Sequence, residues 1–363
     1  MEVLISFCIT VYNQQDLVRK CIESIIPYNG DDIEIVISDD GSTENIGGLV
    51  DSFNDKRIKY YRNEENLGHD RNIISALSRA NGQYAFLLRT RDLIIPDAIP
   101  LLIAATKKGN ASYITGEAVN QDGELKIQYS QECFTCGDEA IEANYKLFIH
   151  PSGSMFRLAD LDFKKLRDFL DENEVPKNGF IVHSLIRLEL ATTGDFQLIR
   201  KPVWIYTDSE ASGDRAVNKS KNGVSVYDPS LTVKRYEYEV KWAKETLANE
   251  DYRKVFYLLT ALYLDLITWG FKLTNSDKKS QYHYDYQKVK FSVTKQRKAF
   301  RDVCESLYDS KLGDVIEHRQ KMDKIFRKNK TAEAIKYAVR KVTYGTRLYN
   351  MAARFYKKNI KGL

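Results

Sequence analysis

The chain contains little cysteine: five residues in 363, odd in number and widely spaced. Such sparse thiols exclude the disulfide framework of a small secreted domain and favour a reducing compartment. Cys133 and Cys136 form one CxxC pair, but a zinc site needs two more ligands nearby and none is evident. Cysteine chemistry therefore gives no indication of function.

Long hydrophobic runs are also missing. The most apolar stretch, 255–264, extends only to about Phe271 and includes Asp265, so it falls short of the ~20 clean residues that a membrane-spanning helix needs. Met1 leads directly into an expected strand, so we expect no signal peptide. The sequence predicts a buried helix here and a cytoplasmic protein.

Apolar residues make up 43% of the chain and aromatic residues 12%, which excludes a disordered protein. The length allows one large domain and an appendage. Charge is unevenly distributed: residues 235–363 carry 29 Lys and Arg against 15 Asp and Glu, whereas residues 1–234 carry 26 against 35. A basic half predicts an anionic partner for that half.

Strand and helix patterns alternate through the first hundred residues, as in a parallel sheet wrapped by helices. We expect strands near 3–9, 33–38, 58–62 and 84–88, separated by helices near 14–26, 43–53 and 69–80. Pro96 predicts a further helix over 97–107, because proline fits a first helical turn.

The rest of the chain is expected to change character twice. We expect a hairpin formed by 111–119 and 125–129, and mainly helix over 140–194. Two strands should follow, at 196–199 and 203–207, and then a loop or lid over 209–229. Beyond Val233 only helical periodicity is present. The expected fold is α/β, a mostly parallel Rossmann-like domain over 1–232 followed by a basic helical region over 233–363.

Polar residues close the first two expected strands. Thr10, Tyr12 and Asn13 end the first, and Asp39 and Asp40 follow the second. Ligands bind at the carboxyl ends of parallel strands, where a carboxylate can accept from a base or a ribose and a ring can stack. Taken alone, either motif is better explained by turn and helix-cap chemistry.

The third helix opens on Asn66-Leu67-Gly68-His69-Asp70-Arg71-Asn72. Gly68 permits a close backbone approach, the helix N-terminus favours an anion, and Arg71 can add a bidentate phosphate contact. The alternative is a capped amphipathic helix with a solvated Arg71. The three motifs at these spacings together favour a nucleotide-diphosphate site.

These motifs, with Gly82-x-Tyr84 and Pro96-Asp97, resemble the family 2 glycosyltransferases of GT-A fold. The resemblance covers residues 1 to about 110 and continues weakly to about 208. It implies that Tyr12 and Asp40 contact the nucleotide base, with a UDP-sugar as the usual donor. The stretch 68–73 resembles the branch that includes abequosyltransferase-like enzymes of bacterial surface polysaccharides.

The family places a DXD metal motif just before the proline. Here those positions hold Arg89 and Arg91, and only Asp92, just beyond the pair, is acidic. Mn²⁺ or Mg²⁺ would hold the donor diphosphate; arginine cannot bind that cation but offers charge and five donors to the same oxygens. Three readings stay open: the arginines replace the metal, catalysis is lost, or both side chains point to solvent. We favour replacement, with no required metal.

The catalytic base also departs from the family pattern. Inverting members use a carboxylate at the start of a helix in the acceptor half, where this chain has Phe180 and Ile181. His183 is near enough to be a candidate base, since neutral imidazole can accept a proton at physiological pH. We expect His183 and Asp92 as the catalytic residues; the acidic rivals for the base are Asp171, Glu172 and Glu174.

The sequence thus predicts a glycosyltransferase that moves a sugar from a nucleotide diphosphate to a cell-surface glycan or a lipid-linked glycan, with inversion. The alternative is a catalytically silent module that binds a sugar nucleotide or a partner glycosyltransferase. The tail from His318 to Leu363 interleaves basic and apolar residues, which suits either helices on the anionic inner face of the membrane or a bundle with a solvated basic face. No nucleic-acid-binding motif is recognised.

Overall fold

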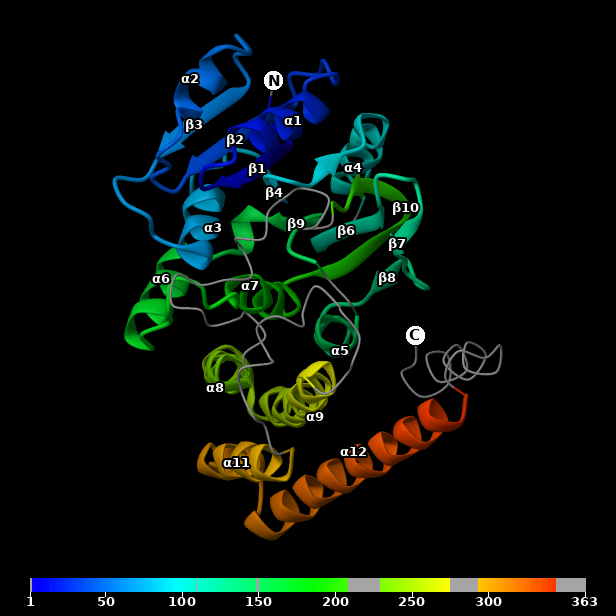
Figure 1. Ribbon diagram of the computed structural model, residues 1–363. Helices are drawn as coiled ribbons and strands as arrows, with labels where there is room; N and C mark the ends of the chain where they lie inside the picture. Colours follow the sequence, from blue (N-terminus) through cyan, green and yellow to red (C-terminus); the bar gives the residue numbers. More distant parts are fainter. Residues whose placement is uncertain (1, 109, 148–149, 208–228, 275–292, 344–363) are drawn as a thin grey trace. The chain divides into compact units, whose positions relative to one another are not determined.

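The computed structural model describes residues 2–108, 110–147, 150–207, 229–274 and 293–343. The chain forms two compact units, residues 1–226 and 227–363 (Figure 1). The expected domain boundary, between 232 and 233, falls inside α8 (Pro229–Thr246), the first helix of the second unit. The expected loop or lid at 209–229 lies outside the described residues, apart from Pro229 at the start of α8.

One ten-stranded sheet runs through the first unit in the order β3-β2-β1-β4-β9-β6-β10-β5, with β7 beside β6 and β8 beside β10. The first four strands pair in parallel: β1 (Ile5–Val11), β2 (Ile33–Asp39), β3 (Ile58–Arg62) and β4 (Tyr84–Arg89). The carboxyl ends of these four strands therefore share one edge of the sheet.

The remaining strands complete the sheet beyond β4. Antiparallel β9 (Ser154–Arg157) lies between β4 and β6 (Ala111–Val119), and β10 (Asp195–Ile205) runs parallel to β6. Three short strands lie at the margins: β5 (Leu93–Ile94), β7 (Leu125–Ile127) and β8 (Cys133–Phe134). The sheet is thus mixed, with a parallel half that carries the predicted site.

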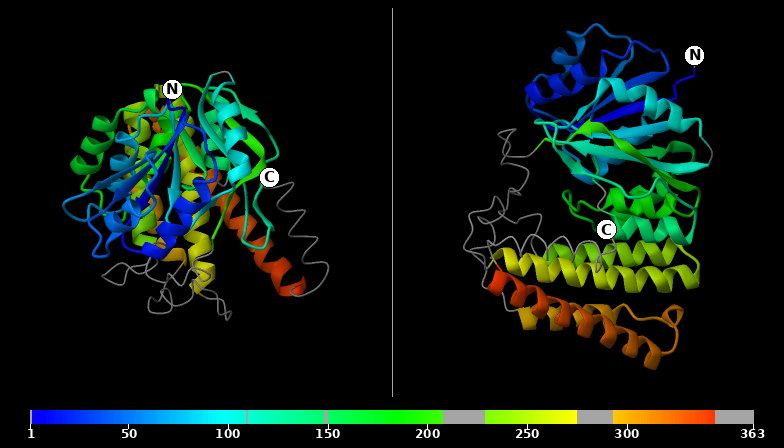
Figure 2. Two further views of the ribbon diagram at one scale, coloured as in Figure 1. Left: turned by 90° about the horizontal axis from the view of Figure 1, so that it is seen from above. Right: turned by 90° about the vertical axis from the view of Figure 1, so that its right-hand side faces the viewer.

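Helices cover both faces of the sheet (Figure 2), and alternate side chains along a strand point to one helical layer or the other. Ile5, Phe7, Ile9 and Val11 of β1 are at most 1% exposed and join the core beneath α1 (Gln15–Ile25), α2 (Ile46–Asp51) and α4 (Ile99–Thr106). On the other face α3 (His69–Ser78) packs on β1 and β2, and Cys8 donates a weak bond to a carbonyl of α3. Helices α5 (Asp138–Lys146), α6 (Phe163–Glu172) and α7 (Val182–Leu190) pack on this side.

The structure confirms the expected strands and helices of the first ninety residues, and it corrects three later expectations. Residues 154–157 were expected to be helical but form β9, because their buried side chains fill the place between β4 and β6. The strands expected at 196–199 and 203–207 are one strand, β10, whose register shifts on either side of Pro202. The helix expected at 97–107 is a 3₁₀ turn, η1 (Pro96–Ala98), followed by α4.

The described part of the second unit is helical. Helix α9 (Asn249–Thr274) contacts α8, α11 (Val293–Ser306) and α12 (Val315–Thr343). The predicted buried helix is confirmed, since Val255, Phe256 and Leu259 on α9 are fully buried. Among the residues that the structure describes, no helix is long and apolar enough to cross a membrane.

Candidate active site

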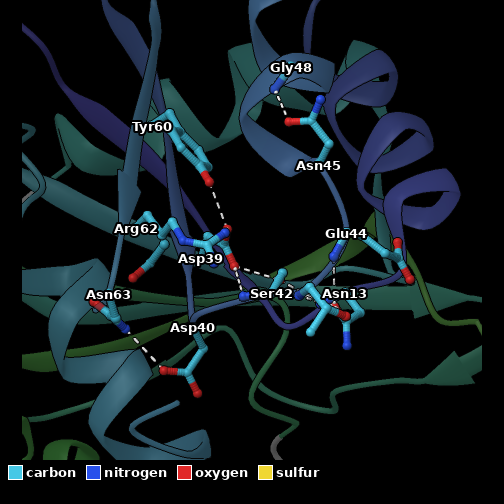
Figure 3. A network of polar contacts seen from close by, with 12 residues as sticks. Asn13, Asp39, Asp40, Ser42, Glu44, Asn45, Gly48, Tyr60, Arg62 and Asn63 are labelled. Atoms are coloured by element: carbon cyan, nitrogen blue, oxygen red, sulfur yellow. Dashed lines mark hydrogen bonds and ion pairs between the residues drawn. The ribbon is translucent and has the colours of Figure 1, made fainter. Parts of the chain in front are cut away.

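The loops that follow β1 and β2 are tied together through Asn13. Its backbone is left-handed (φ 60°), and its side-chain oxygen accepts hydrogen bonds from the backbone N of Thr43 (2.8 Å) and Glu44 (3.3 Å). Its own N–H donates to Ser42 Oγ (2.7 Å; Figure 3). Asn13 therefore fixes the neighbouring Tyr12, whose side chain is 42% exposed and is free to stack on a ligand ring.

Asp39 is fully enclosed by protein donors (Figure 3). One carboxylate oxygen accepts from Ser42 N (2.9 Å), and the other accepts from Tyr60 Oη (2.7 Å) and Arg62 Nη1 (3.3 Å). Burial and the bond to Asp39 raise the pKa of Tyr60 to about 12, so the phenol keeps its proton. The sequence placed Asp39 among the donor-binding residues; its burial and its bonds to protein donors favour a role in holding the turn.

Asp40 joins the end of β2 to the start of α3. Its Oδ1 accepts from Asn63 Nδ2 (3.0 Å) and Leu67 N (2.8 Å), and its Oδ2 accepts from Gly68 N (2.9 Å). A carboxylate has about four acceptor positions, so one remains for a ligand. Gly68 has a φ of 87°, and a Cβ there would lie 2.3 Å from the carbonyl oxygen of Lys177. Only glycine fits where the backbone at residue 68 approaches the backbone of Lys177 this closely.

Arg71, which the sequence assigned to the diphosphate, is engaged elsewhere. Its Nη2 donates to Asp171 Oδ1 (2.6 Å) and its Nη1 donates to the carbonyl oxygen of Val175 (3.1 Å). The guanidinium thus ties α3 to the end of α6 and the turn beyond it. The same ion pair occupies Asp171, one of the rival bases, so the geometry favours a positioning role for both residues.

Arg89 lies at the carboxyl end of β4, with Thr10 of β1 as its neighbour in register. Its Nε donates to Asp92 Oδ2 (2.7 Å), which also accepts from Ser152 Oγ (2.6 Å), while Asp92 Oδ1 accepts from Thr207 N (3.1 Å). Burial would raise the pKa of Asp92, but the charge of Arg89 and these donors bring it below its usual value. Asp92 was expected to be catalytic; it is fully buried, and its contact with Arg89 favours a positioning role.

The residues at the expected metal motif do not fit a divalent cation. Arg89 and Arg91 bring two positive charges to the positions where carboxylates would be needed, and the oxygens of Asp92 already accept three hydrogen bonds. Within the part of the chain that the structure describes, no group of three His, Cys, Asp or Glu side chains could hold a metal ion. The two positive charges at the end of β4 favour an anion over a cation.

His150 adds a neutral donor to this end of the sheet. Its Nδ1 accepts from Ser152 N (3.1 Å), so the ring proton of the neutral form is on Nε2. Burial, together with the charges of Arg89 and Arg91, lowers the pKa of His150 to about 3. The imidazole is therefore uncharged at physiological pH, beside two arginines.

Two aromatic side chains, Trp204 of β10 and Tyr206 just after it, pack around His150 and Arg89. The His150 ring stacks on Trp204 (centroids 5.3 Å apart) and meets the edge of Tyr206 (5.5 Å), over which Arg89 also lies (Cζ to ring centroid 5.7 Å). A Cβ at Gly153 would lie 2.2 Å from Trp204 Nε1. The sequence did not predict His150, because its partners are brought in from strands far along the chain.

The start of α7, where the resemblance expects the base, meets the start of α3. Asp70 is fully buried, and its Oδ1 accepts from Ile181 N (3.2 Å) and Val182 N (3.3 Å), which caps α7 from another helix. His183 is half-buried in the first turn of α7. Glu172 and Glu174 are exposed, and as bases they stay predictions.

Comparisons with known proteins agree with this geometry. The chain is 24% identical over 278 residues to a GalNAc(5)-diNAcBac-PP-undecaprenol beta-1,3-glucosyltransferase of Campylobacter jejuni, covering 72% of this chain and 83% of that protein. It is 36% identical over 104 residues to abequosyltransferase RfbV of Salmonella typhimurium, covering 27% of this chain and 31% of that protein.

Among solved structures, residues 1–349 of S. aureus TarS in complex with UDP-GlcNAc superpose with a TM-score of 0.57 at 16% identity, covering 92% of each chain. The relatives are named as transferases, and none of these comparisons supports the alternative of a silent module. Residues 6–170 match the family described as glycosyl transferase family 2. The first unit has the GT-A fold, and its residues 6–170 belong to the family 2 glycosyltransferases.

Proposed function

We propose that this enzyme transfers a sugar from a UDP-sugar to a lipid-linked glycan intermediate of a bacterial cell surface, with inversion and without a divalent cation. The observation that carries the proposal is the end of β4, where Arg89 is held by buried Asp92 and lies beside Arg91 and neutral His150. Such a corner can neutralise a departing diphosphate with fixed charges.

The donor would lie along the carboxyl edge of the parallel strands. Tyr12 offers its exposed ring to the base, Asp40 offers its remaining acceptor position, and Thr10 lies between these residues and Arg89. Arg89 and Arg91 take the diphosphate. The acceptor oxygen then attacks C1 of the sugar as the bond from C1 to the phosphate oxygen breaks; His183 is the base predicted from the sequence.

Support for the substrate classes comes from the relatives. The Campylobacter relative is named for an undecaprenyl-diphosphate-linked acceptor, and the TarS neighbour was solved with UDP-GlcNAc. A lipid-linked acceptor also agrees with the basic C-terminal half, which we propose holds the protein peripherally at the cytoplasmic face of the membrane.

The proposal is tested by assaying the purified chain with UDP-glucose, UDP-galactose and UDP-GlcNAc against undecaprenyl-diphosphate-linked GalNAc, with and without EDTA. We expect transfer from at least one donor at a rate that EDTA leaves unchanged, because arginine supplies the charge. Strict dependence on added Mn²⁺ or Mg²⁺ would show that the arginines do not replace the metal. Nucleotide binding without turnover on this panel would favour the silent module.

A further inference from the structure

A histidine and a buried carboxylate form a dyad where α3 and α7 begin. His69 Nδ1 lies 3.1 Å from Asp70 Oδ1, and Asp70 is fully buried whereas the His69 side chain is 22% exposed. Because a carboxylate oxygen only accepts, Nδ1 carries the hydrogen and Nε2 is left with its lone pair. A base oriented by a buried carboxylate is the arrangement that activates hydroxyl groups in many enzymes.

Further hydrogen bonds to the Asp70 carboxylate explain why the dyad is rigid. The backbone N–H groups of Ile181 and Val182, at the start of α7, donate to Asp70. The N-terminus of a helix favours negative charge, and these bonds fix the plane of the Asp70 side chain. One residue thus caps α7 and orients the imidazole.

The dyad also lies at the position expected for the base. The His69 ring packs on Phe180 with centroids 4.5 Å apart, and Phe180 and Ile181 occupy the positions where the resemblance expects the carboxylate base. On its other side, His69 directly follows Gly68, whose N–H donates to Asp40 at the nucleoside end of the site. No described residue is shown bonding to His69 Nε2, so that atom can receive a substrate proton.

We propose that His69 is the catalytic base, with Asp70 as its positioning residue; this rests on the transferase function proposed above. The acceptor hydroxyl gives its proton to His69 Nε2 while its oxygen forms the bond to C1 of the donor sugar. The bond from C1 to the diphosphate oxygen breaks, and UDP leaves with the electron pair. The imidazolium then returns its proton to water.

The test compares His69→Phe and His69→Ala with the unmodified chain, using UDP-sugar and undecaprenyl-diphosphate-linked GalNAc. His69→Phe keeps a ring against Phe180 but cannot accept a proton, so kcat should fall by ~10²–10⁴-fold, with UDP affinity unchanged. Added imidazole should restore part of the rate of His69→Ala, which a purely structural role would not allow.

Each other outcome decides against the proposal in a recognisable way. A His69→Phe variant with full activity shows that the ring only packs on Phe180. If His183→Ala loses transfer and regains it with added imidazole while His69→Phe stays active, the base is His183. An unmodified chain that binds UDP but transfers to no acceptor overturns the proposed function itself, and the base with it.

Discussion

At the residue scale, the proposed replacement of a metal by arginine depends on how the guanidinium at the end of β4 is held. A guanidinium is always charged and offers several donors in a fixed plane, but it must be held still to be useful. Buried Asp92 does this for Arg89 through Nε (2.7 Å), which leaves the rest of the guanidinium for another anion. The carboxylate that a metal site would have used as a ligand here orients a cation.

We expect Arg91→Ala to weaken UDP binding by roughly 10- to 100-fold, since a hydrogen bond to a charged group contributes about 1.5–3 kcal/mol. The affinity for uridine should stay unchanged, because the contact is to the diphosphate. Titration calorimetry with UDP and uridine measures both. Arg200→Ala, an exposed arginine of β10, is the matched control; equal losses for both ligands would mean that Arg91 supports the fold instead.

The lowered pKa of His150 predicts an acid-sensitive corner. Its pKa is about 3 in the folded chain against 6.5 ordinarily, so below pH 6.5 the unfolded chain binds a proton that the folded chain does not. The free energy of unfolding therefore does not depend on the titration of His150 above pH 6.5, and it decreases as the pH falls from 6.5 toward 3. The loss should be roughly 1 kcal/mol per pH unit, less than the full ~1.4 because the ring is only half-buried.

This loss is measured by urea unfolding between pH 7 and pH 4. His150→Phe keeps a ring on Trp204 but does not titrate, so its stability should fall less steeply over this range. If the free energy of unfolding falls equally steeply with pH in the unmodified chain and in His150→Phe, protonation of His150 costs no stability. The ring is then more accessible to solvent than its contacts indicate.

At the element scale, the loop before β9 decides where His150 and Ser152 lie. Gly153 has a φ of 83°, and an added Cβ would lie 2.2 Å from Trp204 Nε1. We expect Gly153→Ala to lower the free energy of unfolding by about 2–4 kcal/mol, from left-handed strain plus a displaced Trp204. Gly123→Ala is the matched control: its φ is 80°, but a Cβ there meets nothing within 4 Å.

Thermal unfolding of the two variants separates strain from steric overlap. Gly123→Ala should lose only about 1 kcal/mol, the cost of a left-handed alanine. Equal shifts of the unfolding temperature in both variants would show that the loop adjusts without moving Trp204. The position of β9 would then not depend on the close approach of Gly153 to Trp204.

The elements of the parallel half were predictable because each carries its own signal. An apolar run of about six residues followed by Asp39-Asp40-Gly41 predicts a strand and a turn from local sequence alone. Strand β9 was not predictable: three of its four residues are buried between β4 and β6, which are separate in sequence, and no local pattern distinguishes it from a helix.

The candidate site divides in the same way. Its members at strand ends, such as Tyr12, Asp40 and Arg89, follow from spacing, because parallel strands end at one edge. The roles of Arg71 and Asp92 did not follow, because each is decided by a partner far along the chain: Asp171 for the first, Ser152 and Thr207 for the second. Sequence spacing predicts the edge, while tertiary contacts decide which side chains reach a ligand.

At the scale of the whole molecule, charge divides between the two units. Residues 235–363 carry 29 basic against 15 acidic residues, while the rest of the chain is acidic. The described part of the second unit uses some of these cations internally: Arg297 donates to the carbonyl oxygen of Phe326 (2.8 Å) and Arg301 to Asp323 (2.7 Å). The last basic residues, beyond 343, lie outside the described part of the chain.

We predict that the protein binds vesicles containing anionic lipid through this end of the chain, and that binding weakens with salt as exposed charges are screened. Each basic residue near the surface contributes about 1 kcal/mol, so losing five should lower the partition coefficient by at least ~100-fold. The variant exchanges five residues for glutamine: Arg347, Arg354, Lys357, Lys358 and Lys361. Deleting 331–363 should have the same effect and leave UDP binding unchanged.

The control must remove the same charge from the other unit. Five exposed basic residues of the first unit serve, exchanged for glutamine in the same way: Lys20, Lys107, Lys108, Arg200 and Lys201. Cosedimentation with vesicles at low and high salt should show that this variant still binds, since net charge alone is not the cause. If both variants bind equally, or if the unmodified chain ignores anionic vesicles at low salt, the basic tail packs on protein, and the acceptor lipid must be reached without it.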